Sequence, residues 1–345
     1  MAIDSGKAFL DLVEKSSSIL VSSQLAPDPD AICSLLLLGE TLRINFPDKT
    51  VTLALDEEPV YDLHFIDGYD QIIFGQILDT IKSCKPDLIF ITDNDSYDRI
   101  SRNDVDAIRA IVKERGIKTA AFDHHEPTHN DELALLVNRG VAAASQEVYH
   151  LCFDVLGLQP PKGYEQMTML AILDDTDRFK YHYPNYTETL QIAGKLIDSG
   201  IDVQKLDARL RRFTVDQMLI MGHLASNIHA EEGYTYSYIS DEYAAEWVRA
   251  GKAIADIRLG RAYFVDHFIR NISDNLWGFV VFPDLTAPTG TYYASFRATR
   301  GSMNVETIGT SFGGGGHSES AGAKILAPNV DQAIRQVQAA IKQMH

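Results

Sequence analysis

Short apolar runs alternate with amphipathic segments through the N-terminal part of the chain. Four runs rich in Val, Ile, Leu and Phe have the length and composition of buried strands. They cover residues 18–22, 51–55, 87–91 and 117–122. Between them, apolar side chains recur at helical spacing, as in residues 32–42 and 105–112. Strands that alternate with helices predict a mainly parallel sheet with helices on both faces.

The pattern changes after about residue 189. Helical spacing continues to about residue 227, and the runs that follow are aromatic, strand-like and bounded by turn residues. They cover residues 234–238, 277–282 and 292–296. The last helix is marked by Asn329 at its cap, Gln332 at the capping-box position and an apolar stripe from Val330 to Ile341. We therefore predict an α/β protein with one domain at 1–190, a helical connector at 191–228 and a smaller α/β domain at 229–345.

The composition is that of an ordinary globular protein. Of the 345 residues, 45% are hydrophobic and 23% are charged. No apolar run approaches the roughly 20 residues of a membrane helix, and the N-terminus lacks the basic and apolar regions of a signal peptide. The cysteines Cys33, Cys84 and Cys152 are too far apart in the sequence to form a metal or redox motif. We expect a reduced, cytoplasmic protein that does not associate with membranes.

The formal net charge of −17 restricts the partners of this protein. A protein that binds long nucleic acid neutralises many phosphates with Lys and Arg, and a global acidic field opposes such binding. Short anionic substrates that are held locally, with the help of a metal ion, fit this charge better. Some of the acidic residues are themselves candidate metal ligands, whose charge bound cations would offset.

Acidic residues follow the first predicted strand closely. Asp28 and Asp30 lie in a turn that Pro27 and Pro29 stiffen, just before a predicted helix. Carboxylates this close together repel one another unless a cation lies between them. An Asp-Pro turn that caps the helix is the alternative interpretation.

Three further polar motifs have similar positions. Asp93 is the first ionisable residue after the third strand, and Asp123, His124 and His125 follow the fourth. Asp175 lies in an acidic segment after a predicted helix at 165–173. A polar turn explains any one motif alone, but the carboxyl ends of parallel strands meet at one edge of the sheet, where such folds build their sites. Six or seven oxygen and nitrogen ligands at that edge would suffice for two divalent ions about 3.5–4 Å apart.

A run of glycines marks the C-terminal region. Gly313, Gly314, Gly315 and Gly316 are followed by His317, between a helix-like segment and a predicted strand. Glycines permit positive φ and close backbone approach, so exposed N–H groups could hold a phosphate. His317 and Arg297 would supply donors to the same anion. A disordered linker is the alternative, but the run does not lie at a domain junction.

The motifs, taken in order, resemble those of the DHH phosphoesterases with a DHH-associated C-terminal domain. The residues that carry this resemblance are Asp28, Asp30, Asp93, Asp123, His124, His125, Asp175 and the segment 313–317. Within the family, the chain looks most like the bacterial oligoribonuclease (nanoRNase) and phosphoadenosine-phosphate phosphatase group. The resemblance covers nearly the whole chain.

The resemblance implies a set of metal ligands and two divalent ions, with manganese as the expected metal. Asp30, Asp93, His124 and Asp175 would hold one ion, and Asp28 with a bridging Asp93 would hold the second. Asp123 would orient His124, and His125 would face the substrate or the second ion. The family usually has a His four residues before the first Asp, and here that position is Gln24. An amide is a weaker ligand than an imidazole, so the second site should bind its ion more loosely.

The resulting hypothesis is metal-dependent hydrolysis of short oligonucleotides or small nucleotides to mononucleotides. A phosphoadenosine-phosphate phosphatase and a cyclic or linear dinucleotide phosphodiesterase are the alternatives within the same class. A catalytically weakened nucleotide-binding protein is the alternative from another class, because Gln24, and Ser318-Glu319-Ser320 after the glycines, depart from the family pattern. The chain leaves the oligomeric state open, with a homodimer among the options.

Overall fold

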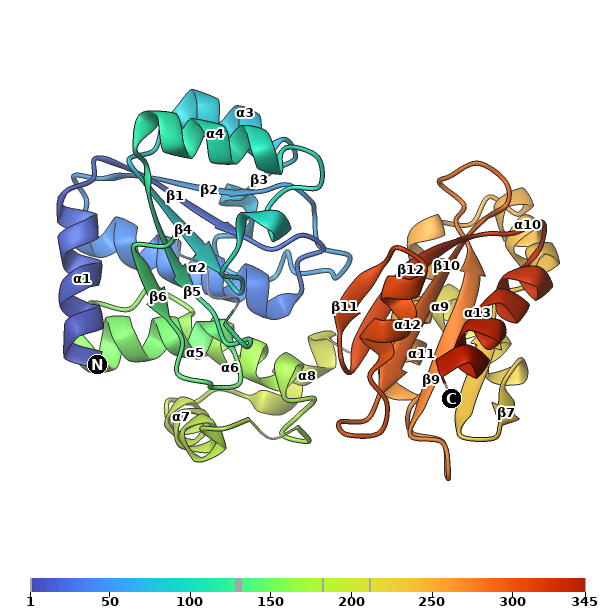
Figure 1. Cartoon of the computed structure of the whole chain (residues 1–345). Helices are drawn as coiled ribbons and strands as arrows, with labels where there is room; N and C mark the ends of the chain where they lie inside the picture. Colours follow the sequence, from blue (N-terminus) through green and yellow to red (C-terminus); the bar gives the residue numbers. More distant parts are fainter. Residues whose placement is uncertain (1, 128–131, 182, 211, 345) are drawn as a thin grey trace. The chain divides into compact units, whose positions relative to one another are not determined.

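The sheet of the N-terminal unit is parallel throughout. In the computed structural model, which describes residues 2–127, 132–181, 183–210 and 212–344, the chain divides into two units, 1–211 and 212–345 (Figure 1). The boundary falls inside the predicted connector. The first sheet has the order β3-β2-β1-β4-β5-β6. Its strands are β1 (Ser18–Ser23), β2 (Thr50–Leu55), β3 (Ile73–Phe74), β4 (Leu88–Thr92), β5 (Lys118–Phe122) and β6 (Leu135–Val137).

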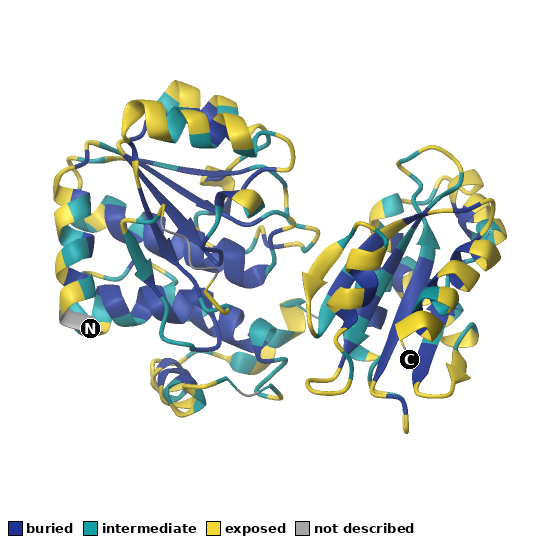
Figure 2. Cartoon of the chain, in the orientation of Figure 1, coloured by how far each residue is buried: buried dark blue, intermediate teal, exposed yellow. Residues whose placement is uncertain are grey.

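Helices cover both faces of this sheet, as the alternating pattern predicted. Figure 1 shows α3 and α4 over one face, and α1, α2, α5 and α6 over the other. Fully buried side chains line both interfaces, such as Leu36 of α2 on one side and Ile108 of α4 on the other. Figure 2 shows that the central strands of the sheet are coloured as buried. The helices are α1 (Ala2–Glu14), α2 (Pro29–Asn45), α3 (Ile77–Cys84), α4 (Val105–Arg115), α5 (Ala144–Tyr149), α6 (Tyr164–Asp175), α7 (Tyr186–Asp198) and α8 (Val203–Leu210).

The C-terminal unit has a mixed sheet of the order β11-β12-β10-β9-β8-β7, in which only β8 and β9 are paired in parallel among the described strands. Side chains of β10 alternate between buried and partly exposed, which is the period of a strand with one face on a core. The strands are β7 (His229–Glu231), β8 (Tyr234–Tyr238), β9 (Trp277–Pro283), β10 (Thr291–Ala298), β11 (Gly315–His317) and β12 (Ser320–Leu326).

Two apolar clusters, one on each face, hold this second sheet between helices. The helices are α9 (Val215–Ser226), α10 (Asp241–Arg249), α11 (Ile254–His267), α12 (Val305–Ser311) and α13 (Val330–Met344). Buried residues of α12 and α13 pack on one face, and those of α9, α10 and α11 on the other. The Gln332 backbone N–H donates to Asn329 Oδ1 at 3.0 Å, so the predicted cap of the last helix is confirmed. The predicted α/β fold is confirmed.

In the described part of the chain, every helix is too short or too polar to span a membrane.

Candidate metal centre

Three neighbouring parallel strands bring their next residues to one edge of the sheet. Ser23 at the end of β1 is opposite Thr92 of β4, and Thr92 is opposite Phe122 of β5. The residues that follow are therefore aligned, and they are Gln24, Asp93 and Asp123. Asp93 has a φ of +57°, in the left-handed region that Asp tolerates better than most side chains. This conformation turns the chain sharply as it leaves β4.

Helices α2 and α6 supply further carboxylates to the same edge. Asp28 is the N-cap of α2 and accepts from Ala31 N–H at 2.9 Å, and Asp30 lies in the first turn of that helix. Pro29 fits the first helical position because its missing N–H would have no partner there. Asp175 is the last residue of α6, which packs against α2. The cap interpretation and the ligand interpretation of Asp28 are therefore compatible.

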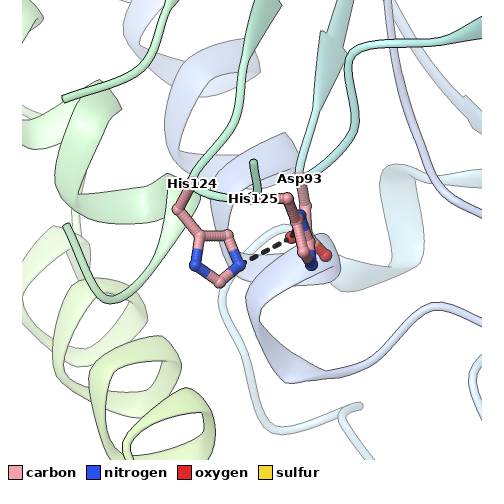
Figure 3. Close-up of side chains that lie close together, drawn as sticks. All are labelled: Asp93, His124 and His125. Atoms are coloured by element: carbon pink, nitrogen blue, oxygen red, sulfur yellow. Dashed lines mark ion pairs between the residues drawn. The ribbon is translucent and has the colours of Figure 1, made fainter. Parts of the chain in front are cut away.

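His124 lies at the centre of this group of side chains. Its Nε2 is 3.3 Å from Asp93 Oδ1 and 3.8 Å from Asp175 Oδ2. Ligand atoms of Asp30, His124 and Asp175 lie within 4.8 Å of one another, and so do those of Asp93, His124 and His125. Figure 3 shows His124 and His125 directed toward Asp93. The structure thus brings together the ligands expected for the first ion.

Burial makes these carboxylates unusual acids. Asp30 is 0% exposed and Asp93 is 1% exposed. Burial, and then the neighbouring carboxylates, raise the pKa of Asp93 and of Asp175 well above the ordinary value. Burial also raises the pKa of Asp30, although the nearby His124 opposes that rise. A cation among these groups would favour their ionised form.

The donor set fits a divalent ion. Asp93 Oδ1, Asp175 Oδ2 and His124 Nδ1 are buried and have no hydrogen-bond partner among the described residues. A buried polar atom without a partner costs roughly 1–3 kcal/mol, so three such atoms close together need an explanation. Carboxylate oxygens with one imidazole suit manganese, zinc or iron. A divalent cation would satisfy the two carboxylates and offset their charge.

Asp30 is held in place by the start of α5. Its Oδ2 accepts from Ala144 N–H at 2.6 Å, and its Oδ1 accepts from Ser145 N–H at 3.0 Å. Each oxygen keeps a second lone pair for a ligand role. Both donors are backbone N–H groups, which do not rotate as side-chain donors do, so the two hydrogen bonds fix the Asp30 carboxylate in one orientation. This contact joins positions that are far apart in the sequence.

Comparison with known proteins relates the domain that contains this sheet edge to a protein family. Residues 18–173 match the model of the DHH family, N-terminal domain. This region, a little under half of the 345 residues, is similar to the N-terminal domain of the DHH family. The matched region contains Asp28, Asp30, Asp93 and the Asp123-His124-His125 motif, and Asp175 lies just beyond its end.

The chain is also similar to individual relatives in sequence and to solved structures in fold. The Bacillus subtilis bifunctional oligoribonuclease and PAP phosphatase NrnA is 25% identical over 220 residues, which are 62% of this chain and 64% of that protein. The match thus spans a little under two thirds of the relative's length. The crystal structure of an exopolyphosphatase-related protein from Bacteroides fragilis has a TM-score of 0.83 at 20% identity and covers 99% of this chain and 96% of its own. RecJ from Thermus thermophilus, solved in complex with Mn²⁺, has a TM-score of 0.54 at 12% identity and covers 99% of this chain and 54% of RecJ.

The DHH motif itself has one contact that differs from our expectation. We expected Asp123 to orient the ring of His124, but the ring that it contacts is that of His125, with His125 Nδ1 at 2.8 Å from Asp123 Oδ1. The same oxygen accepts from the backbone N–H groups of His124 and His125, at 2.9 and 3.3 Å. These hydrogen bonds outweigh the cost of burial and lower the pKa of Asp123. Asp123 therefore fixes the backbone of the motif and the ring of its last residue.

Sequence reasoning missed several residues around the DHH motif. Asn138, after β6, donates to the His125 carbonyl oxygen at 2.7 Å. Tyr183 donates from its hydroxyl to the Asp175 carbonyl oxygen at 3.0 Å, and its ring lies 5.9 Å from the His124 ring. Arg99 donates to the side-chain carbonyl of Gln24. Nothing in the local pattern of Arg99 distinguishes it from other loop residues, but a polar Asn138 directly after a strand was a usable signal.

In the C-terminal unit, close packing explains part of the glycine run. A Cβ on Gly314 would lie 2.1 Å from the Gly322 carbonyl oxygen, and one on Gly316 would lie 2.3 Å from that of Ser320. Gly313 has a φ of +73°. Gly315 has neither constraint, since a Cβ there would meet nothing within 4 Å. Packing therefore does not account for Gly315.

The two predicted donors of the C-terminal unit have different surroundings. Arg297 Nε donates to Asp266 Oδ1 at 2.6 Å, and its Nη1 donates to the Phe296 carbonyl oxygen at 2.9 Å. An anion at Arg297 would share or displace the carboxylate of Asp266. His317 lies on the exposed strand β11, in a hairpin with β12. A role for Arg297, His317 and the segment Gly313–Gly316 in substrate binding stays a prediction.

Proposed function

We propose that this protein is a metal-dependent phosphoesterase that hydrolyses short oligonucleotides or small nucleotides to mononucleotides. The observation that carries the proposal is the convergence of Asp30, Asp93, His124 and Asp175 at one sheet edge, with buried ligand atoms that lack partners among the described residues. The family match and the oligoribonuclease named among the relatives support the same reaction class.

Asp30, Asp93, His124 and Asp175 would hold a divalent ion. Bound there, such an ion would act as a Lewis acid on a phosphoryl oxygen and would lower the pKa of a nearby water. Manganese is our proposed metal, supported by the donor set and by the Mn²⁺ that RecJ binds. The family resemblance implies a second ion at Asp28 and Asp93, and the surroundings of Gln24 bear on whether this chain binds it.

We propose that His125 transfers a proton during the reaction. Its Nδ1 is hydrogen-bonded to the ionised Asp123, which keeps the proton on that nitrogen in the neutral ring. Asp123 and the Asn138 contact to the His125 backbone would hold the ring in one orientation. Proton transfer by such a positioned side chain is worth about 10²–10⁴-fold in rate.

The proposed substrates are short and anionic. The net charge of −17 disfavours long duplex nucleic acid, which requires many phosphate contacts. We propose that Arg297, His317 and the glycine segment 313–316 bind the substrate. At Gly315, neither packing nor a positive φ requires a glycine. We further propose a cytoplasmic location, which the unpaired cysteines Cys33, Cys84 and Cys152 support.

The experiment is hydrolysis of di-, tri- and tetranucleotides by the purified, metal-stripped protein with and without added Mn²⁺. We expect mononucleotides to form only with the metal, and the His124→Ala variant to lose the activity. The matched control is His64→Ala, because His64 lies far along the chain from the motifs and is largely exposed. Intact substrate at high enzyme concentration, or the same rate after chelation, would refute the proposal.

A phosphatase that acts on PAP is a second candidate, favoured by the PAP phosphatase named in the Bacillus subtilis relative. The same centre would serve both reactions, since each displaces an oxygen at phosphorus. Comparing kcat/KM for PAP, cyclic and linear dinucleotides, and oligonucleotides would rank these substrates. Binding of all of them without turnover would instead favour a nucleotide-binding protein.

A further inference from the structure

Gln24 lies between a guanidinium and two carboxylates of the centre. Its Nε2 donates to Asp93 Oδ2 at 2.5 Å and to Asp28 Oδ2 at 3.3 Å. Its Oε1 accepts from Nη2 of Arg99. Gln24 is 6% exposed, so this chain of hydrogen bonds is largely shielded from water. The arrangement connects Arg99, at the end of a short 3₁₀ helix after β4, to the carboxylates at the end of β4 and at the start of α2.

Chemistry fixes the orientation of the Gln24 amide. Arg99 has only donors to offer, and a carboxyl oxygen that carries no proton, such as the Oδ2 atoms of Asp28 and Asp93 that face the amide nitrogen, can only accept. If the amide were turned over, its NH₂ would face the guanidinium and its oxygen would face Asp28 and Asp93. Donors would then meet donors and acceptors would meet acceptors. The amide nitrogen must therefore face the carboxylates for as long as Arg99 holds the oxygen.

The amide nitrogen occupies the place of a cation. It is within hydrogen-bond distance of both Asp28 and Asp93, where a positive charge would otherwise offset their repulsion. An amide nitrogen has no available lone pair, so in this orientation Gln24 cannot act as a metal ligand. A metal ion at Asp28 and Asp93 would displace the NH₂ group and would require the amide to rotate away from Arg99.

Backbone contacts hold Arg99 in position for this role. The Leu25 N–H donates to the Arg99 carbonyl oxygen at 2.6 Å, so the segment that carries the guanidinium is tied to the residue next to Gln24. Arg99 donates to the amide oxygen of Gln24, and the NH₂ group of the same amide donates to Asp28 and Asp93. The pair thus places polarised hydrogen-bond donors beside the two carboxylates, where a metal ion would place its positive charge.

We propose that the Arg99–Gln24 pair takes the place of a second metal ion beside Asp28 and Asp93, so that the centre of this protein binds a single divalent ion. That ion would be held by Asp30, Asp93, His124 and Asp175. The inference rests on the proposed function only in that it takes these residues to bind a divalent ion. It concerns the number of ions and does not depend on the substrate.

The test is to count Mn²⁺ in the full-length protein. Metal-stripped protein is equilibrated with excess Mn²⁺, and bound metal is measured by elemental analysis and by electron paramagnetic resonance. We expect one ion per chain, with the spectrum of an isolated Mn²⁺. Gln24→His introduces an imidazole that can coordinate at this position, so this variant should bind a second ion and show the exchange-coupled spectrum of a carboxylate-bridged pair.

Two further variants separate the roles of the pair. Arg99→Met leaves the amide free to rotate its oxygen toward Asp28 and Asp93, so affinity for a second ion should rise by about 10–100-fold over wild type. Gln204→His is the matched control, since Gln204 is exposed on α8, and it should bind one ion like wild type. Circular dichroism of each variant establishes that it is folded.

A coupled spectrum with two ions in the wild-type protein would overturn the inference, and so would the absence of any bound ion. An unchanged ion count in both Gln24→His and Arg99→Met, with both variants folded, would also overturn it. A different result would refute the proposed function. If the wild type binds one isolated Mn²⁺ and Gln24→His binds a second, but the protein hydrolyses no nucleotide, the proposed function is refuted and the inference about the number of ions is supported.

Discussion

Replacing Asp175 by Asn should stabilise the metal-free protein and at the same time abolish its stabilisation by metal. The Asp175 Oδ2 atom is buried without a hydrogen-bond partner among the described residues. Its pKa is raised well above the ordinary value, first by burial and then by the charges of Asp30, Asp28 and Asp93. Near neutral pH, folding without metal therefore either forces like charges together or makes a carboxyl group take up a proton, and both cost free energy. Asn keeps the size of the side chain and removes one of these charges.

The magnitude follows from the cost of such groups. A buried polar atom without a partner costs about 1–3 kcal/mol, and the new amide recovers only part of this. We expect the metal-free variant to gain about 1–2 kcal/mol in the free energy of unfolding. For a domain of roughly 150–250 residues, 1 kcal/mol shifts Tm by about 2–4 °C, so Tm should rise by roughly 2–8 °C. Mn²⁺ at about 100 times its Kd should stabilise the wild type by roughly 2.7 kcal/mol.

The assay is thermal unfolding followed by circular dichroism, with chelator and with Mn²⁺, for the wild type, Asp175→Asn and Asp11→Asn. Asp11 is exposed on α1, so its variant should follow the wild type in both conditions. We expect Asp175→Asn to have the highest Tm in chelator and almost no shift with Mn²⁺. A large loss of stability in chelator, or a full Mn²⁺ shift in the variant, would refute our reasoning about the centre.

Three further predictions concern pH and the C-terminal unit. Because the pKa of Asp93 is raised well above 3.8, the folded metal-free protein keeps a proton that the unfolded chain loses. The free energy of unfolding, measured in urea melts, should therefore fall as pH rises above about 4, by roughly 1.4 kcal/mol per pH unit for each such carboxyl. A rise over this window would contradict the prediction. Gly314→Ala should lower Tm because its Cβ meets backbone, whereas Gly315→Ala should keep Tm and raise KM for nucleotides; equal Tm values would count against the packing argument. Asp266→Asn should lower KM by freeing Arg297 for an anion, and an unchanged KM would argue against Arg297 as a phosphate ligand.

The sheet edge could be predicted from sequence because buried parallel strands leave a strong signal. Residues 88–91 are all buried apolar side chains, and the polar Asp93 just beyond them marks the carboxyl end of the strand. The short strands β3 and β6 were not predicted, because two or three residues are too few to show the alternation of apolar and polar side chains that marks a strand. Helix α1, whose Phe9 and Val13 enter the core, was also missed.

Contacts between distant residues could not be predicted. The DHH motif pointed to a metal centre, yet it did not reveal that Asp123 binds the ring of His125 rather than that of His124. Gln24 stood out as a departure from the family pattern, but the orientation of its amide depends on Arg99, which is 75 residues away. The glycine run indicated phosphate binding, whereas the close approach of Gly314 to β12 gives it a structural cause as well. In each case the decisive partner could not be read from the local pattern.

The most direct test of the metal centre is an anomalous difference map from crystals of this protein soaked in Mn²⁺. We predict a single strong peak per chain, coordinated by Asp30, Asp93, His124 and Asp175, with Gln24 still bound to Arg99. A map without a peak among these four side chains, or with the ion bound elsewhere, would contradict the account.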